Sequence, residues 1–235
     1  PCAILVVTAN VAANVSLVFE AMGNGALDVV KTPSFDLQTC QAENDDLLKK
    51  IEMIASLIES CSKEEAVTCA ALETALPSFP VSPFLLIGAS TGGPIAIRRI
   101  LSSLGSDFPY TTVILQHVDQ EFAEGLVSWL QEESSLKVQL AESGQELNPG
   151  EVYVAGKNSH LVLTPRMRLN YLSEGSFSHL LNKPSIDIFF NSVANISGLK
   201  GIACLLTGMG SDGAQGLFAL KNAGFETIIE DSSTA

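Results

Sequence analysis

The sequence predicts an α/β protein whose larger part is a doubly wound, mostly parallel sheet. Two patterns predict this fold. Short apolar runs without polar alternation, such as Thr112–Gln116, are typical of strands buried on both faces of a sheet. Segments with apolar residues at helical spacing lie between these runs. Repeated strand–helix units of this kind build a parallel sheet with helices on both faces.

The first 60 residues carry two such strand–helix units. The expected elements are a strand over Ala3–Thr8, a helix over Val11–Met22, a strand over Ala26–Lys31 and a helix over Glu43–Ser60. Two strands are too few for an independently stable sheet. We therefore expect residues 1–60 to be the C-terminal part of a larger domain.

Residues 61–82 are expected to form a linker, because periodicity is weak there and prolines gather toward the end. The second domain is expected to span residues 83–235. Its expected strands are Phe84–Gly88, Thr112–Gln116, Val138–Ala141, Glu151–Ala155, Leu161–Thr164, Leu169–Leu172, Gly201–Leu206 and Glu226–Ile229. Its expected helices are Pro94–Leu104, Gln120–Glu133, Ser185–Ile196 and Gly213–Ala223.

Charge and cysteine content narrow the function classes. The 235 residues include 13 Lys and Arg against 26 Asp and Glu, for a net charge of −13. Such a surface repels phosphate backbones and anionic lipid, so nucleic acid is not expected as a partner. No apolar run is long enough for membrane insertion. Five cysteines without a Cys-x-x-Cys pair favour a reducing, cytoplasmic setting with no zinc site, and we expect no cofactor.

Ser90 is the candidate nucleophile. It lies in Gly88-Ala-Ser-Thr-Gly92, which follows an expected strand and precedes an expected helix. This is the G-x-S-x-G spacing of a nucleophile elbow, in which glycines allow a tight turn. The amides after Ser90, at a helix N-terminus, are natural donors to an oxyanion. A turn with this pattern and no catalytic role is the alternative interpretation.

His117 and Asp212 complete a candidate triad. Each follows an expected strand, and the carboxyl ends of parallel strands meet at one edge of the sheet. A serine nucleophile needs a base, and the base needs an orienting carboxylate. His160 and His179 fit this role less well, because one lies inside the strand-rich middle and the other in a loop. The chain order Ser, His, Asp differs from the order in the α/β-hydrolase fold.

The segment Gly208-Met-Gly-Ser-Asp-Gly213 also matches the G-x-G-x-x-G pattern of a dinucleotide site, and Glu230 lies where a ribose-binding acid is expected. Asp212 would then place a carboxylate beside a pyrophosphate, which is electrostatically unfavourable. We therefore favour the hydrolase interpretation over NAD binding.

Four stretches together resemble the catalytic domain of the CheB family, the chemoreceptor protein-glutamate methylesterases. They are Ile87-Gly-Ala-Ser-Thr-Gly-Gly-Pro94, Gln116-His117, Pro184-Ser-Ile-Asp187 and Leu206-Thr-Gly-Met-Gly-Ser-Asp-Gly-Ala214. The resemblance implies a Ser90–His117–Asp212 triad and suggests that Met209 lines the active site. We expect backbone amides near Thr91 and in the Met209-Gly210 loop to bind the oxyanion.

Residues 1–60 resemble the C-terminal half of a response-regulator receiver domain, a flavodoxin-like fold. Thr8 and Lys31 lie where that family keeps its switch hydroxyl and its phosphate-contacting lysine. The phosphorylated aspartate would belong to an upstream strand, and the C-terminal segment is one that the family continues. The chain therefore looks truncated at both ends, and we expect it not to respond to phosphodonors.

The resemblance implies the function and partners. The expected reaction is demethylation, with glutamine deamidation as a second reaction, on the cytoplasmic helices of methyl-accepting chemoreceptors. An intact receiver would receive phosphate from the pathway's histidine kinase. Gln116-His-Val-Asp119 looks more like the WspF-type branch, which leaves the receptor open between chemotaxis and surface sensing. The alternatives are a non-enzymatic signalling adaptor and a serine esterase for another ester.

Overall fold

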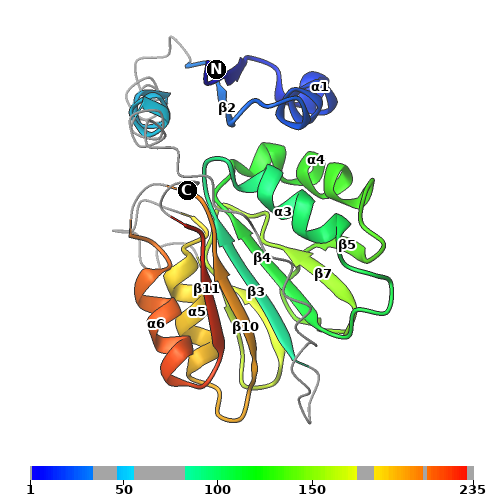
Figure 1. Cartoon of the computed structure of the whole chain (residues 1–235), viewed down its shortest axis with the longest axis vertical. Helices are drawn as coiled ribbons and strands as arrows, with labels where there is room; N and C mark the ends of the chain where they lie inside the picture. Colours follow the sequence, from blue (N-terminus) through cyan, green and yellow to red (C-terminus); the bar gives the residue numbers. More distant parts are fainter. Residues whose placement is uncertain (1, 34–46, 56–82, 174–182, 209–210, 232–235) are drawn as a thin grey trace.

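A six-stranded sheet forms the centre of the larger domain in the computed structural model, which describes residues 2–33, 47–55, 83–173, 183–208 and 211–231. The strand order is β11-β10-β3-β4-β7-β5, and every neighbouring pair is parallel (Figure 1). The strands are β3 (Phe84–Ala89), β4 (Thr111–Gln116), β5 (Lys137–Leu140), β7 (Glu151–Val154), β10 (Gly201–Leu205) and β11 (Glu226–Ile229). The predicted α/β fold with a mostly parallel sheet is confirmed.

Helices cover both faces of this sheet. α3 (Gly93–Ser102) and α4 (Gln120–Gln131) lie on one face, and α5 (Ile186–Ala194) and α6 (Ala214–Asn222) lie on the other (Figure 1). All six residues of β3 are buried, and successive side chains enter opposite cores. Leu85 and Ile87 join the core under α3 and α4, whereas Leu86 joins the core under α5 and α6. Burial on both faces explains the uninterrupted apolar runs of the central strands.

The strand-rich middle divides between two sheets. β5 and β7 join the parallel sheet. β9 (Arg168–Tyr171) lies between β6 (Gln145–Glu146) and β8 (Leu161–Leu163) in a separate sheet and pairs with both in antiparallel fashion. β6 was not predicted, because two polar residues form no apolar run. The backbone of β9 induces this short strand by pairing with it.

The N-terminal segment consists of β1 (Leu5–Thr8), α1 (Val11–Gly23), β2 (Asp28–Lys31) and a helical stretch at 47–55. β1 and β2 are parallel and form a sheet of their own, above the carboxyl ends of β3 and β4 (Figure 1). The predicted linker at 61–82 lies outside the described residues. None of the described helices combines the length and apolar character that crossing a membrane requires.

α1 packs on α4 at a close helix crossing. The Phe19 and Trp129 rings are 5.5 Å apart between centroids, and both side chains are buried. Gly125 of α4 makes the close approach possible, because a Cβ there would overlap Val15 of α1. The N-terminal segment thus has an apolar contact with the larger domain in addition to its contact above the sheet.

We expect Gly125→Ala to lower the free energy of unfolding by about 1–3 kcal/mol, because overpacking against Val15 outweighs the higher helix propensity of alanine. Urea unfolding of the chain measures the change. Val15→Ala is the matched control, because it shortens the side chain that a Cβ at Gly125 would overlap. The double variant should be more stable than the sum of the two single changes predicts. A Gly125→Ala protein more stable than the parent would contradict this packing account.

Candidate active site

Ser90 lies on the tight turn between β3 and α3. Its N–H donates to the carbonyl of Thr207 at 2.9 Å, and its carbonyl accepts from the N–H of Gly93 at 2.8 Å. Gly92 has a left-handed φ of 79°, which is why the turn needs glycine there. The Gln116 side-chain amide also donates to the Ser90 carbonyl, at 2.8 Å. The turn is therefore held from both neighbouring strands, β4 and β10.

The loop after β10 passes directly over Ser90. A Cβ at Gly208 would lie 2.5 Å from the Ser90 Cβ, and Gly208 has a φ of 154°. Only a residue without a side chain allows this approach. The predicted site residues Met209 and Gly210 come next in this loop and lie outside the described residues.

His117 and Asp212 form a hydrogen bond, although they are 95 positions apart in the sequence. The distance between His117 Nε2 and Asp212 Oδ2 is 2.9 Å. The His117 N–H donates to the carbonyl of Ala89 at 3.0 Å, so the histidine follows its strand beside the Ser90 turn. Since Nε2 faces the aspartate, Nδ1 is the ring nitrogen left for a second partner. In the described part of the chain no hydrogen bond joins Ser90 Oγ to His117.

The Asp212 carboxylate lies at the N-terminus of α5. It accepts from the N–H groups of Ile186 at 2.9 Å and Asp187 at 3.0 Å, and from Ser185 Oγ at 2.8 Å. Burial by itself raises the pKa of Asp212, but the hydrogen bonds from His117 and from the α5 terminus outweigh it and lower the pKa to about 2. The positive end of the helix dipole also favours the anion. Asp212 is therefore ionised at neutral pH.

Two supporting residues were not assigned roles from the sequence. Ser185 caps α5 by accepting from the Ile188 N–H, while its hydroxyl donates to Asp212. Gln116 donates to the carbonyls of both Ser90 and His117. The signal for Ser185 was a serine directly before a helix, which is typical of an N-cap. No comparable signal marked Gln116, because its partners are known only once the strands are paired.

The other candidate histidines do not join this cluster. His160 is buried, and its Nδ1 accepts from the Ser185 N–H at 3.1 Å, so it supports the start of α5. His179 lies outside the described residues. Glu230 accepts from the Thr207 N–H at 2.7 Å and so fastens the loop over Ser90. Asp212, which belongs to the glycine-rich segment, is bound to His117 and to the N-terminus of α5, so it is part of this site. Among the described residues, no group of three His, Cys, Asp or Glu side chains is placed to hold a metal ion.

Two of the three predicted residues near the N-terminal segment make contacts between that segment and the larger domain. Thr91 is buried, and its hydroxyl donates to Asp28 Oδ2 at 2.7 Å. Lys31 forms an ion pair with Glu121 at 2.9 Å. The Thr8 hydroxyl stays within its own segment, where it accepts from the Asn14 side-chain amide.

A parallel α/β sheet that brings a serine, a histidine and an anionic aspartate to the carboxyl ends of its strands defines a hydrolase-type domain. Comparison with known families narrows this class, because residues 85–235 match the family described as CheB methylesterase. The chain belongs to this family.

Curated relatives and a solved structure are similar over most of the chain. "Protein-glutamate methylesterase/protein-glutamine glutaminase 2" of Burkholderia lata is 45% identical over 236 residues, covering 100% of this chain and 68% of the relative. The protein of that name in Cupriavidus metallidurans is 42% identical with the same coverage. The crystal structure of the Thermotoga maritima CheB methylesterase catalytic domain matches with a TM-score of 0.58 and 35% identity, over 64% of this chain and 80% of that chain.

The low pKa of Asp212 predicts a pH-dependent contribution to stability. A carboxyl whose pKa is lower in the folded state stabilises the fold above its unfolded pKa, and this contribution is lost as pH falls toward the folded pKa of about 2. The stability difference between the parent chain and Asp212→Asn should shrink by about 1 kcal/mol from roughly pH 6 to roughly pH 3. Urea unfolding at both pH values measures it. A difference that stays constant with pH would contradict the lowered pKa.

Proposed function

We propose that the chain hydrolyses γ-glutamyl methyl esters on the cytoplasmic helices of methyl-accepting chemoreceptors. The hydrogen bond between His117 Nε2 and Asp212 Oδ2, beside the Ser90 turn, is the observation that carries the proposal. The names of the curated relatives supply the protein-glutamate methyl ester and add protein-glutamine deamidation as a second reaction for the same site. The chemoreceptor as the carrier of the ester follows from the resemblance to the family.

In the proposed mechanism Ser90 is the nucleophile and His117 the base. The Ser90 Oγ–H proton passes to His117 Nδ1 as Oγ bonds to the ester carbonyl carbon, and the carbonyl oxygen becomes an oxyanion. The tetrahedral intermediate then expels methanol, which takes the proton from His117. Water attacks the acyl–enzyme and gives a proton to His117, the bond to Oγ breaks, and Ser90 regains its proton. The product is a free glutamate.

Asp212 orients the histidine and stabilises the imidazolium that forms in each half-reaction. Its four hydrogen bonds suit this role, since they hold both carboxylate oxygens in place. The backbone amides near Thr91 and in the Met209-Gly210 loop are the proposed oxyanion donors. At the turn into α3 the N–H groups of Gly92 and Gly93 are bonded to the carbonyls of Leu27 and Ser90, and Pro94 has no N–H, so the Thr91 N–H is the proposed donor there.

The first measurement is methanol release from receptor membranes that carry radiolabelled methyl groups. Ser90→Ala should lower turnover about 10⁶-fold, because loss of the nucleophile removes the covalent route. Ser102→Ala is the matched control, since this exposed serine of α3 bonds only within its own helix, to the carbonyl of Arg99 at 3.0 Å, and it should leave turnover unchanged.

Two other results would favour the alternative functions. Turnover of p-nitrophenyl esters without any methanol release from receptors would favour an esterase for another ester. Receptor binding by a folded chain with neither activity would favour the non-enzymatic adaptor.

We also propose that residues 1–60 are the C-terminal part of a receiver domain, with Thr8 and Lys31 as switch residues. This segment would restrain the site until the pathway's histidine kinase phosphorylates an intact receiver. The support is the contact of this segment with the residues after Ser90. Asp28 binds the Thr91 hydroxyl, and the Gly92 N–H donates to the carbonyl of Leu27 at 3.0 Å.

If this contact restrains the site, Asp28→Ala should raise the turnover of p-nitrophenyl acetate several-fold, because the Thr91 turn is freed. Lys137→Gln is the comparison variant. It weakens an exposed ion pair with Glu151 at the amino end of β5, which is worth less than about 1 kcal/mol, so it should change turnover little. An unchanged or lower rate in folded Asp28→Ala would contradict the restraint.

A further inference from the structure

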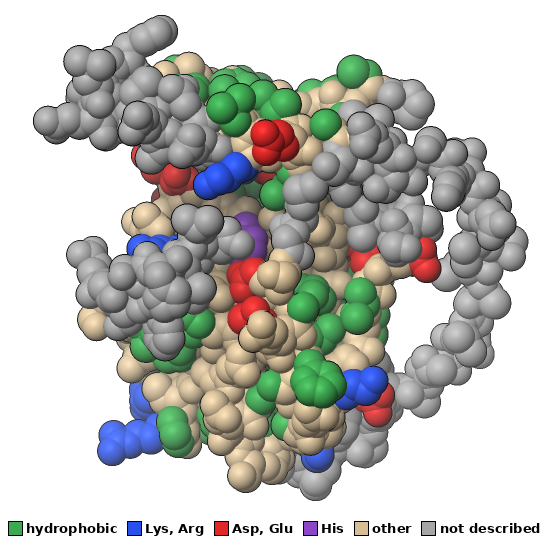
Figure 2. Space-filling model, turned by 90° about the vertical axis from the view of Figure 1, so that its left-hand side faces the viewer, with side chains coloured by type: hydrophobic (Ala, Val, Ile, Leu, Met, Phe, Trp, Pro, Cys, Tyr) green, Lys and Arg blue, Asp and Glu red, His purple; other side chains and the backbone are tan. Residues whose placement is uncertain are grey.

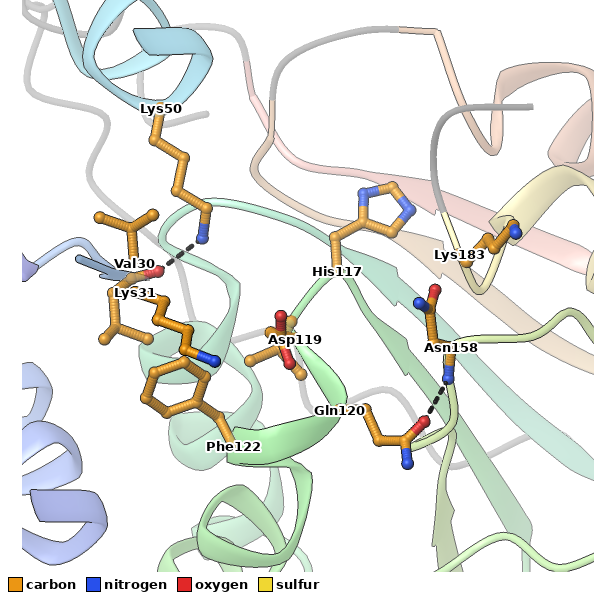
Figure 3. Close-up of a pocket in the computed structure, with 11 residues that line it drawn as sticks. Val30, Lys31, Lys50, His117, Asp119, Gln120, Phe122, Asn158 and Lys183 are labelled. Atoms are coloured by element: carbon orange, nitrogen blue, oxygen red, sulfur yellow. Dashed lines mark hydrogen bonds between the residues drawn. The ribbon is translucent and has the colours of Figure 1, made fainter. Parts of the chain in front are cut away.

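A pocket of about 250 Å³ lies beside the catalytic histidine, and its lining is unusually basic. Three of the 13 basic residues of the chain line it, namely Lys31, Lys50 and Lys183. Figure 3 shows Lys31 and Lys50 on one side of His117, and Lys183 with Asn158 on the other. Figure 2 shows one histidine side chain at the surface, with basic and acidic side chains near it. In a protein of net charge −13, this pocket is a local exception.

Two of these lysines are already occupied by carboxylates. Lys31 pairs with Glu121 at 2.9 Å, and Lys50 pairs with Asp28 at 2.9 Å and donates to the carbonyl of Val29. Both belong to the N-terminal segment. Lys183 is exposed and has neither a carboxylate nor a hydrogen-bond partner in the described part of the chain. Its ammonium group is therefore available to an anion from outside.

The acidic groups of the pocket are engaged elsewhere. Asp119 caps α4 by accepting from the Glu121 N–H at 2.9 Å. The Asp212 carboxylate, on the far side of His117, is held by His117 and the α5 terminus. Among the three lysines that line the pocket, Lys183 is thus the one without a carboxylate partner in the described part of the chain.

Lys183 and Asn158 both lie next to residues of the elements that hold the reacting groups. Lys183 lies two positions before Ser185, which caps α5 and binds Asp212. The Asn158 N–H donates to Gln120 Oε1 at 2.9 Å, and its side-chain amide points toward Lys183 (Figure 3). An ammonium and an amide offer hydrogen-bond donors to the two oxygens of one carboxylate.

We propose that Lys183, assisted by Asn158, binds an acidic side chain of the receptor helix that lies beside the target glutamyl ester. This inference rests on the proposed function and names the local sequence that the site selects. Side chains three or four positions apart on a helix have Cβ atoms about 5–6 Å apart on one face, so an acidic residue one turn from the ester would face the same side of the enzyme as the ester. The local charge also offsets the repulsion between an acidic enzyme and an acidic segment.

The test is the kinetics of methanol release by Lys183→Glu and Lys183→Gln on methylated receptor. KM should rise about 10-fold for Lys183→Glu and less for Lys183→Gln, with kcat little changed, because the charge acts on substrate binding. Higher salt should narrow the difference. Lys221→Glu, an exposed lysine in the last turn of α6, gives the same net charge far from the pocket and should leave KM unchanged.

Two readouts separate recognition from structure. The turnover of uncharged p-nitrophenyl acetate should be the same in Lys183→Glu as in the parent, and an equal loss on both substrates would overturn the proposal in favour of a structural role beside Ser185. A receptor whose acidic residues near the ester are changed to lysine should restore KM for Lys183→Glu.

The inference and the proposed function fail in different ways. If the parent chain releases no methanol, the proposed function fails. If the parent is active and KM for Lys183→Glu equals that of Lys221→Glu, only the inference fails.

Discussion

The Asp212 carboxylate is the anchor on which the arrangement of the site depends. A carboxylate that loses most of its water is stable only when donors replace that water, and Asp212 has four donors, from two parts of the chain. Two come from the first N–H groups of α5, which have no partner within the helix. The same bonds fix the loop after β10, the start of α5 and the ring of His117. One ionised group therefore unites elements that are far apart in the sequence.

Ser90 is held by a second set of contacts, which is independent of Asp212. Its turn is bonded to Thr207 on one side and to Gln116 on the other, and Glu230 fastens Thr207 in turn. Gly208 lets the loop pass over the serine. The serine and the His–Asp pair are thus supported separately, and the pairing of β3 with β4 and β10 brings them to one edge.

Charge is distributed unevenly around this edge. The surface is acidic as a whole, yet lysines from both parts of the chain surround the pocket beside His117. Lys31 pairs with Glu121 of the larger domain, and Lys50 pairs with Asp28 of its own segment. Lys183 is part of the larger domain. Removal of the N-terminal segment would therefore take away two lysines and leave Lys183 beside the histidine.

Local pattern was sufficient to predict most elements and to propose the three central site residues. β3, β4 and α5 lie within a residue or two of their predicted bounds, because two-faced burial and capping leave marks in adjacent residues. Ser90 and His117 were proposed because each directly follows a strand, and Asp212 because it lies in the loop between a strand and a helix, since parallel strands end at one edge. The domain bounds at residues 60 and 83, and the roles of Thr8 and Lys31, stay predictions.

Only the tertiary structure decided which groups meet. The antiparallel sheet of β6, β8 and β9, the bond of Ser185 to Asp212, the contact of Thr91 with Asp28 and the place of Lys183 beside His117 all join distant segments. Such contacts depend on strand pairing and helix docking, which no short window of sequence encodes. The sequence by itself determined the elements and the kinds of reacting group, and the packing of the sheet determined their partners.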